Sequence, residues 1–391
     1  MVIKDEEMDF EFSKKLEKEL ENSFAKCFQC GTCTARCPGG VISDYRTRKF
    51  MRMAQLGLKD KILGSEDLWN CTTCSTCKIL CPWEVDPLST ILKLRREAVK
   101  AGKENKKHDP LVKSLINYDN PWLQPRAARK KWYKGLDVVD LSNEPGKADV
   151  LYYVGCTATF DKRLWGMSRS VVKVLNKAGI TVGVLGKDEK CCGGTVRGVG
   201  HPEIFEELAK QNVDDLNNAG VDTIIFSCPG CLNTIKNAYK AEKIGEIKPR
   251  LIHVVEYVDE LLKEGKLKLD KDVKRIVTYH DPCHLGKHCE VFDAPRDILK
   301  AIPGLDFREM KFVRKDSWCC GAGGGVKTAF PERATELAVN RLDQAEETEA
   351  DTICSACSFC YQNLLDGLVA KKDSKMEMKD IMELVAEAIE E

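Results

Sequence analysis

Residues 27–38 have the sequence CFQCGTCTARCP, and residues 71–82 have the sequence CTTCSTCKILCP. Both strings place four cysteines at the spacing C-x2-C-x2-C-x3-C and follow the fourth with proline. A chain of 391 residues can bury a core without covalent crosslinks. Eight thiols at fixed spacings therefore indicate metal ligands rather than disulfides.

The spacing is typical of two neighbouring [4Fe–4S] cubane clusters, because three thiolates of a string reach one cube while the fourth turns to the other. One predicted ligand set is Cys27, Cys30, Cys33 and Cys81, and the other is Cys71, Cys74, Cys77 and Cys37. Structural zinc also uses paired C-x2-C groups. Two quartets that each end in Cys-Pro, with no neighbouring histidine, favour iron–sulfur clusters and an electron relay.

Composition narrows the class of protein. The chain carries 61 basic and 61 acidic side chains, so no net field favours nucleic acid or an anionic membrane. The N-terminus has no apolar core of a secretory signal, and the apolar runs are far shorter than the roughly 20 residues of a spanning helix. We expect a cytoplasmic chain with reduced thiols, which reaches a membrane only through a partner.

The segments around the two cysteine strings are predicted to be helical. Apolar residues from Met8 to Leu20 predict one helix over about residues 1–25 that leads into or docks a partner. Residues 90–109 are basic and polar, which favours a solvated helix and then a linker over a docking surface. We therefore predict a helical dicluster domain at 1–109 and a linker at 110–145.

The remainder of the chain is a tandem repeat whose cysteines align at a steady offset. Cys156 corresponds to Cys283, and Cys228 corresponds to Cys357. Each copy starts with an apolar run, DVLYYVGC or KRIVTYHDPC, and continues with helices that alternate with short strands. This order predicts two pseudo-symmetric parallel α/β units, at residues 146–265 and 266–391.

Each repeat supplies one early cysteine, an adjacent pair and a late C-x2-C. The first set is Cys156, Cys191, Cys192, Cys228 and Cys231, and the second is Cys283, Cys319, Cys320, Cys357 and Cys360. Zinc and a simple cubane each use four protein thiolates, so a fifth thiol in both copies favours an unusual metal centre over zinc sites or buried thiols. Glycines beside each pair permit close backbone approach. The run GAGGGVKT does not match a phosphate loop.

From about residue 20 onward the chain resembles heterodisulfide reductase, in the form that fuses a C-like two-cluster domain to a B-like catalytic part. CFQCGTCTARCPGG and LWNCTTCSTCKILCP resemble the electron-transfer part, whereas KCCGG with SCPGC and WCCGAGGG with ACSFC resemble its two Cys-Cys-Gly domains. The resemblance implies a noncubane [4Fe–4S] centre on the five cysteines of one or both repeats, with zinc as the alternative for one. It also implies reduction of the coenzyme M–coenzyme B disulfide to two thiols at these centres.

Three histidines, His280, His284 and His288, flank Cys283. They could donate protons to departing thiolates or hydrogen bonds to cluster sulfurs, but a structural or solvated imidazole is the favoured interpretation of each.

Two further cysteines depart from the repeat. Cys354 offers a second C-x2-C with Cys357, but the alignment of CSFCYQN with CPGCLNT favours Cys357 and Cys360 as the ligand pair. Cys289 has no counterpart in the first repeat and is expected to be a buried apolar residue.

The same repeats occur in iron–sulfur subunits of glycolate and lactate oxidation, fumarate reduction and sulfite reduction, so fold alone does not decide the function. The alternative is therefore an electron-relay subunit of a glycolate- or lactate-type dehydrogenase or another respiratory complex. The sequence contains no flavin or nicotinamide fingerprint. We expect a partner that donates electrons, either a flavin-containing subunit or a b-type cytochrome, and a disulfide substrate.

Overall fold

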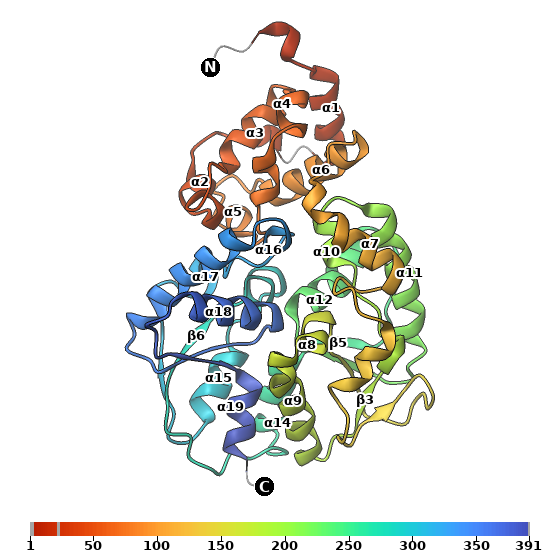
Figure 1. The fold of residues 1–391 in the computed structure, drawn as a ribbon, viewed down its shortest axis with the longest axis vertical. Helices are drawn as coiled ribbons and strands as arrows, with labels where there is room; N and C mark the ends of the chain where they lie inside the picture. The colour runs from red at the N-terminus through yellow and green to blue at the C-terminus, as the bar shows by residue number, and fades with distance from the viewer. Residues whose placement is uncertain (1–3, 22–23, 390–391) are drawn as a thin grey trace.

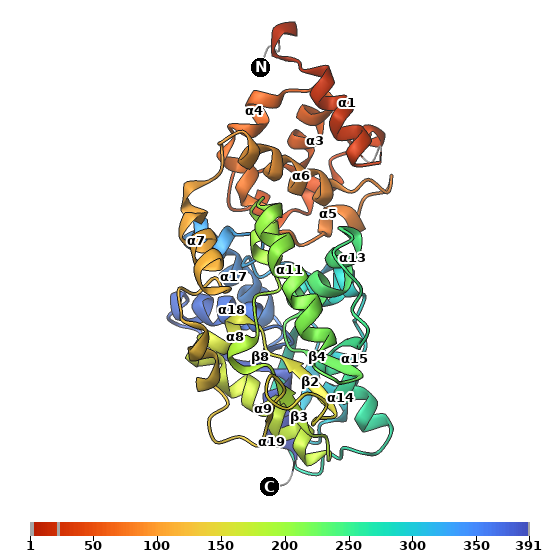
Figure 2. The ribbon, with the colours of Figure 1, turned by 90° about the vertical axis from the view of Figure 1, so that its right-hand side faces the viewer.

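The computed structural model describes residues 4–21 and 24–389 (Figure 1). A helical N-terminal domain sits above two α/β units that stand side by side, and Figure 2 shows the same arrangement turned by 90°. The predicted fold class, a helical ferredoxin-like domain followed by two parallel α/β units, is confirmed. None of the helices in these described residues combines the length and apolar character that crossing a bilayer requires.

Short helices build the N-terminal domain and alternate with its cysteine strings. They are α1 (Phe10–Glu19), α2 (Thr32–Ala35), α3 (Thr47–Gln55), α4 (Lys59–Leu63), α5 (Thr76–Ile79), α6 (Pro87–Lys100) and α7 (Asp109–Tyr118). The two strings have the same backbone conformation at the residue before each short helix. Gly31 before α2 and Ser75 before α5 are both left-handed, with φ of 90° and 64°.

The first helix is shorter than the sequence predicted. Asp9 caps α1 by accepting a hydrogen bond from the Phe12 amide at 2.9 Å, and residues 1–3 and 22–23 of the predicted segment lie outside the described residues. Phe12 and Leu16 are buried in the core of the N-terminal domain. Part of the apolar face of this helix therefore packs within its own chain.

The expectation of a solvated helix over residues 90–109 is wrong for one face of α6. The guanidinium of Arg95 is fully buried, and it donates hydrogen bonds only to backbone carbonyls. These belong to Leu68, Cys71, Gly198 and Gly324, at 2.8–3.1 Å. Four carbonyl partners satisfy the buried cation, and they join the N-terminal domain to both α/β units.

Each α/β unit contains an all-parallel sheet. The strands are β1 (Val139–Asp140), β2 (Val150–Tyr153), β3 (Val182–Val184), β4 (Thr223–Phe226) and β5 (Arg250–His253), then β6 (Ile276–His280), β7 (Asp306–Arg308), β8 (Thr352–Ser355) and β9 (Glu377–Asp380). Their orders are β1-β3-β2-β4-β5 and β7-β6-β8-β9. Without β1, the two sheets have equivalent strand orders, as the tandem repeat predicts. The additional strand β1 comes from the segment expected to be a linker.

Helices cover both sheets and also join them. They are α8 (Cys156–Phe160), α9 (Trp165–Lys177), α10 (Gly194–Gly198), α11 (Pro202–Asn217), α12 (Pro229–Asn233), α13 (Tyr239–Ala241), α14 (Val254–Lys263), α15 (Ala294–Ala301), α16 (Val326–Ala329), α17 (Pro331–Glu346), α18 (Ser358–Ala370) and α19 (Ile381–Ala388). Helix α9 packs on α19, and α14 packs on α15. One hydrophobic core consequently spans the two units.

The parallel sheets place four cysteines of the repeats at equivalent positions. Cys156 follows β2, Cys228 follows β4, Cys283 follows β6 and Cys357 follows β8. Ligands of open parallel sheets bind beyond the carboxyl ends of the strands. The fold therefore directs the repeated cysteines to the ends of the sheets that face the N-terminal domain.

Candidate iron–sulfur centres

The first predicted thiol set surrounds a pocket at the surface of the N-terminal domain. Cys27, Cys30, Cys33 and Cys81 all line this pocket, although Cys81 belongs to the second string. Cys30 is exposed, and the other three are partly buried. The crossed arrangement that the spacing predicted is thus geometrically available.

The second predicted thiol set lies deeper. Burial, followed by the nearby thiols of Cys74 and Cys71, raises the pKa of Cys37 to about 12. Burial, followed by Cys71 and Cys74, also raises the pKa of Cys77. Thiolates crowded out of water need a compensating positive charge, and bound iron supplies one. The donor set therefore fits an iron–sulfur cluster.

All ten cysteines of the two repeats line a single cavity of about 360 Å³ between the units. Its walls also include glycines from both units, among them Gly194 and Gly323. A Cβ at Gly194 would lie 2.5 Å from Thr234 Oγ1 and 3.5 Å from Cys192 Sγ. Only glycine fits this wall, so the space beside the thiols stays free for a bound group.

The second cysteine of each adjacent pair is hydrogen-bonded to neighbouring thiols. Hydrogen bonds with Cys191 and Cys231 lower the pKa of Cys192 to about 5. Hydrogen bonds with Cys319 and Cys360 hold the pKa of the equivalent Cys320 well below its usual value, and the Sγ atoms of Cys320 and Cys360 lie 3.4 Å apart. Thiolate is the form that ligates metal, so both units present soft donors suited to iron.

The two thiol sets meet across the boundary between the units. Cys228 hydrogen-bonds to Cys231 of its own unit and to Cys357 of the other. Cys228 and Cys357 are the equivalent first members of the two late pairs. A group bound in the cavity would therefore contact both repeats.

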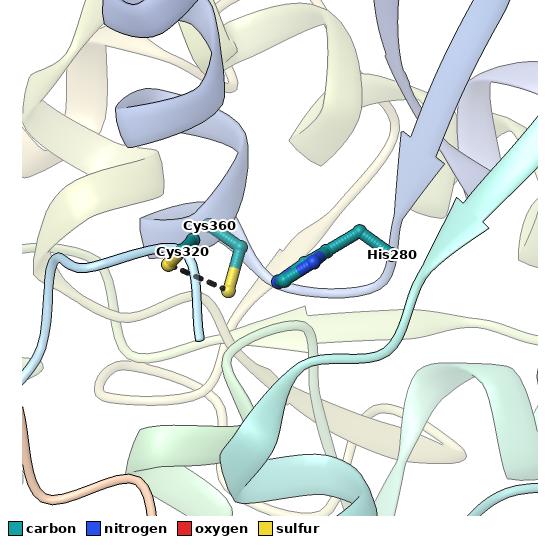
Figure 3. Close-up of side chains that lie close together, drawn as sticks. All are labelled: His280, Cys320 and Cys360. Atoms are coloured by element: carbon teal, nitrogen blue, oxygen red, sulfur yellow. Dashed lines mark hydrogen bonds between the residues drawn. The ribbon is translucent and has the colours of Figure 1, made fainter. Parts of the chain in front are cut away.

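His280 faces the thiols of Cys320 and Cys360, as Figure 3 shows, with the nearest ligand atoms of all three within 4.8 Å of one another. Its Nδ1 accepts a hydrogen bond from Arg341 Nε at 3.1 Å, and burial together with Arg341 lowers its pKa to about 3. The neutral ring consequently carries its proton on Nε2, which has no oxygen or nitrogen partner within the described residues. The ring therefore directs an unpartnered polar nitrogen at the cavity thiols, where a bound group could meet it.

The other two histidines form a stacked pair with centroids 4.4 Å apart. His284 lines the cavity, and its Nδ1 lies 3.4 Å from Cys283 Sγ. His288 reaches the Thr73 carbonyl of the N-terminal domain at 3.1 Å. The pair thus links the cavity to the second cysteine string.

Cys354 and Cys289 lie outside the cavity. Cys354 belongs to β8 and is fully buried in the core, where burial raises its pKa. Cys289 is partly buried beside the core of the first unit, and burial raises its pKa to about 12. This placement leaves Cys357 and Cys360 as the late pair that faces the other thiols.

The N-terminal domain contacts the cavity through Cys74, which packs against Cys283 and Cys319. Backbone approach is close here, since a Cβ at Gly324 would lie 2.3 Å from the Cys71 carbonyl oxygen. Gly324 also has a φ of 61°. The deeper thiol set of the N-terminal domain is therefore in direct contact with the second repeat.

Three basic residues near the thiols were missed by the sequence analysis: Arg95, Arg129 and Lys287. Arg129 is buried and donates to Glu189 at 2.7 Å and to Cys156 Sγ at 3.1 Å. Lys287 is buried and donates to Thr76 and Ser317. No pattern around these residues in one sequence marks them, because their partners lie far away along the chain.

Comparison with known proteins agrees with this organisation. Residues 26–85 match the 4Fe-4S dicluster domain, and residues 150–236 and 277–365 match the cysteine-rich domain. A hypothetical protein from Helicobacter pylori shares the fold, with a TM-score of 0.57 and 12% identity over 97% of this chain and 73% of that one. A dicluster domain followed by two cysteine-rich units defines the iron–sulfur component of an oxidoreductase.

The relatives narrow this class. The D-type subunit of the dihydromethanophenazine:CoB–CoM heterodisulfide reductase from Methanosarcina mazei is 35% identical in an alignment that covers 93% of this chain and 93% of its own. The chain belongs to the family of D-type heterodisulfide reductase subunits, as the cysteine strings predicted. An EtfAB:quinone oxidoreductase from Syntrophomonas wolfei is 33% identical over 84% of this chain and 47% of its own length.

Proposed function

We propose that the chain is the catalytic iron–sulfur subunit of a heterodisulfide reductase and reduces the mixed disulfide of coenzyme M and coenzyme B. The observation that carries this proposal is the convergence of ten thiols from both repeats on one cavity of about 360 Å³. A relay would need only clusters in sequence, whereas here the two proposed centres would face each other across one shared cavity, where a substrate could contact both.

The proposed ligands follow the thiol sets described above. Cys27, Cys30, Cys33 and Cys81 hold one cubane cluster, and Cys37, Cys71, Cys74 and Cys77 hold the other. The five cysteines of each repeat hold a noncubane [4Fe–4S] centre. Bound iron–sulfur groups supply one-electron chemistry and an affinity for sulfur.

Polar residues of this chain bind and orient the substrate in the cavity. Thr195 and Gln362 line the cavity with polar groups, which can orient the polar parts of a disulfide. Lys327 also lines it, held by Asn363 and Asp366 at 2.7 and 2.6 Å. Reduction of one disulfide consumes two electrons and two protons and yields two thiols.

A partner protein has to supply these electrons. We propose a flavin-containing subunit or a b-type cytochrome, and any contact with a membrane would then be through that partner. The related protein from Methanosarcina mazei is named as part of an enzyme that couples dihydromethanophenazine to the heterodisulfide.

Metal analysis and electron paramagnetic resonance (EPR) of the anaerobic full chain test the proposal. We expect about sixteen irons with matching sulfide and no zinc, and a new paramagnetic signal when the heterodisulfide is added to the reduced protein. About twelve irons with one zinc would instead make one repeat structural. Cluster-replete protein without a substrate-induced signal would favour an electron-relay subunit of another oxidoreductase.

Matched cysteine variants locate the reaction. Cys228→Ser removes a thiol at the boundary between the units and should abolish the substrate-induced signal while the signals of both cubane clusters persist. Cys289→Ser changes a cysteine outside the cavity and should leave all signals intact. Equal loss of signal in both variants would argue against the cavity as the reaction site.

A further inference from the structure

The N-terminal domain exposes two large aromatic side chains beside its outer thiol set. Phe28 is 71% exposed and Trp83 is 52% exposed, and their ring centroids lie 5.4 Å apart. Phe28 stands between Cys27 and Cys30, and Trp83 follows Cys81 by two residues. Neighbouring exposed aromatic residues at a functional site are typical of protein contact surfaces.

Basic residues are frequent in the segment that carries Phe28 and the outer thiols. Residues 24–55 contain six basic side chains and one acidic side chain, in a chain whose charges otherwise balance. Arg48 lines the same pocket as the aromatic pair, and Arg52 donates to Gln55, which also binds the Cys27 carbonyl. Lys26 and Lys49 are exposed, Asp44 is the acidic residue of that range, and the acidic Glu84 lies next to Trp83. The surface therefore carries a local positive charge.

We infer that Phe28, Trp83 and the surrounding Lys26, Arg48, Lys49 and Arg52 form a docking face for an acidic protein that donates one electron at a time. This inference rests on the proposed function, since it names the kind of partner that feeds the clusters. The exposed thiol of Cys30 marks the point at which the outer cluster approaches the surface. The carrier loses one electron, the cluster on Cys27, Cys30, Cys33 and Cys81 gains it, and two such transfers supply one disulfide.

The positive charge of the docking face favours a partner with negative charge. Opposite charges raise association rates by about 10- to 1,000-fold, and salt weakens the effect. The aromatic pair then supplies apolar contact at the centre of the interface, with the polar groups at its rim. A membrane surface and a second copy of this chain are the alternative occupants of the same face. The experiment distinguishes both of them from an acidic carrier.

Stopped-flow reduction of the cluster-loaded full chain by a reduced acidic flavodoxin provides the test. We expect the second-order rate constant to fall at least about 10-fold in the double variant Lys26→Glu, Lys49→Glu, and to fall in Trp83→Ser. High salt should remove the effect of the charge change. Reduction by a small viologen dye should not slow in any variant, because the dye needs no docking face.

Matched controls use exposed residues of the second α/β unit. The double variant Lys372→Glu, Lys375→Glu repeats the charge change at two exposed lysines, and Val369→Ser removes a side chain that is 71% exposed. Equal rates in the two double variants would overturn the inference, as would faster reduction by a basic carrier. A dimer that Trp83→Ser dissociates, or vesicle binding that it abolishes, would assign the face to another occupant.

The stopped-flow assay contains no disulfide, so it tests the docking face independently of the proposed function. A separate disulfide-reduction assay with viologen tests the proposed function. A chain that accepts electrons from the flavodoxin but reduces no disulfide retains the docking face and loses the proposed reaction. A chain that reduces the disulfide with viologen, but reacts equally with acidic and basic carriers, retains the reaction and loses the docking face.

Discussion

Replacement of Lys287 by methionine removes a buried positive charge between two thiol sets while keeping a side chain of similar length. Its Nζ donates to Thr76 Oγ1 and to the Ser317 carbonyl, both at 2.6 Å. No carboxylate forms an ion pair with Lys287 within residues 4–21 and 24–389. A buried cation with only neutral oxygen partners requires a counter-charge, and thiolate-bound clusters provide it.

The size of the effect follows from the geometry. Thr76 Oγ1 lies 2.6 Å from Lys287 Nζ and 3.3 Å from Cys74 Sγ, so these nitrogen and sulfur atoms are at most about 5.9 Å apart. Two unit charges at about 6 Å interact by about 3 kcal/mol at an effective dielectric constant of about 20. For a one-electron couple this corresponds to a potential on the order of 100 mV. Loss of the cation destabilises the more negative reduced state and therefore lowers the potential.

An anaerobic redox titration of the full chain, monitored by EPR, measures this shift. Lys287→Met should lower the potential of the cluster on the deeper thiol set by on the order of 100 mV, whereas Lys287→Arg keeps the charge and should shift it far less. The cluster on the outer set should change little in either variant. A shift below about 20 mV in the methionine variant, or equal shifts in both, would refute the electrostatic reasoning.

Three further predictions concern stability and ligand identity. Gly324→Ala and Gly102→Ala both place a side chain at positive φ, at a cost of about 1–2 kcal/mol. Since Gly102 has no atom within 4 Å of its added Cβ, we expect a clearly larger fall in the urea midpoint for Gly324→Ala, and equal falls would contradict the tight interface. Burial lowers the pKa of His108 to about 4, so the unfolded chain binds more protons below about pH 6.5 and the free energy of unfolding decreases as the pH falls towards 4. His108→Gln should remove up to about 3 kcal/mol of that decrease, and an unchanged pH profile of urea unfolding would argue otherwise. In metal analysis, Cys354→Ala should retain full iron content and Cys357→Ser should lose iron, whereas the reverse result would exchange their proposed roles.

Much of the fold was predictable because the signals were local. Cysteine spacing, apolar strand runs and the steady offset between Cys156 and Cys283 all lie on the printed sequence. They correctly predicted a helical dicluster domain and two parallel α/β units. The position of the repeated cysteines also follows from the topology, because parallel strands end at one edge of a sheet.

What could not be predicted depends on long-range contacts. Arg95 lies in a basic helical segment, where solvation is the default expectation, yet carbonyls from three parts of the chain satisfy its buried charge. Arg129 lies in the segment expected to be a linker, and its partners Glu189 and Cys156 are distant in sequence. No periodicity or motif encodes such contacts, because each depends on how separate elements pack.

The two repeats differ in the contacts that their early cysteines make. The deeper thiol set of the N-terminal domain touches the second repeat through Cys74 and Cys319. In the first repeat, Cys156 instead accepts a hydrogen bond from the Arg129 guanidinium of the segment that precedes the repeat. On the proposed function, electrons would enter through the second repeat and cross the cavity to the first, near Cys228 and Cys357. A disulfide between two such centres would meet one that adjoins the relay and one whose early cysteine accepts a hydrogen bond from a buried guanidinium. Sequence symmetry therefore does not imply equal roles, and loss of iron from each repeat separately should affect disulfide reduction in the cavity differently.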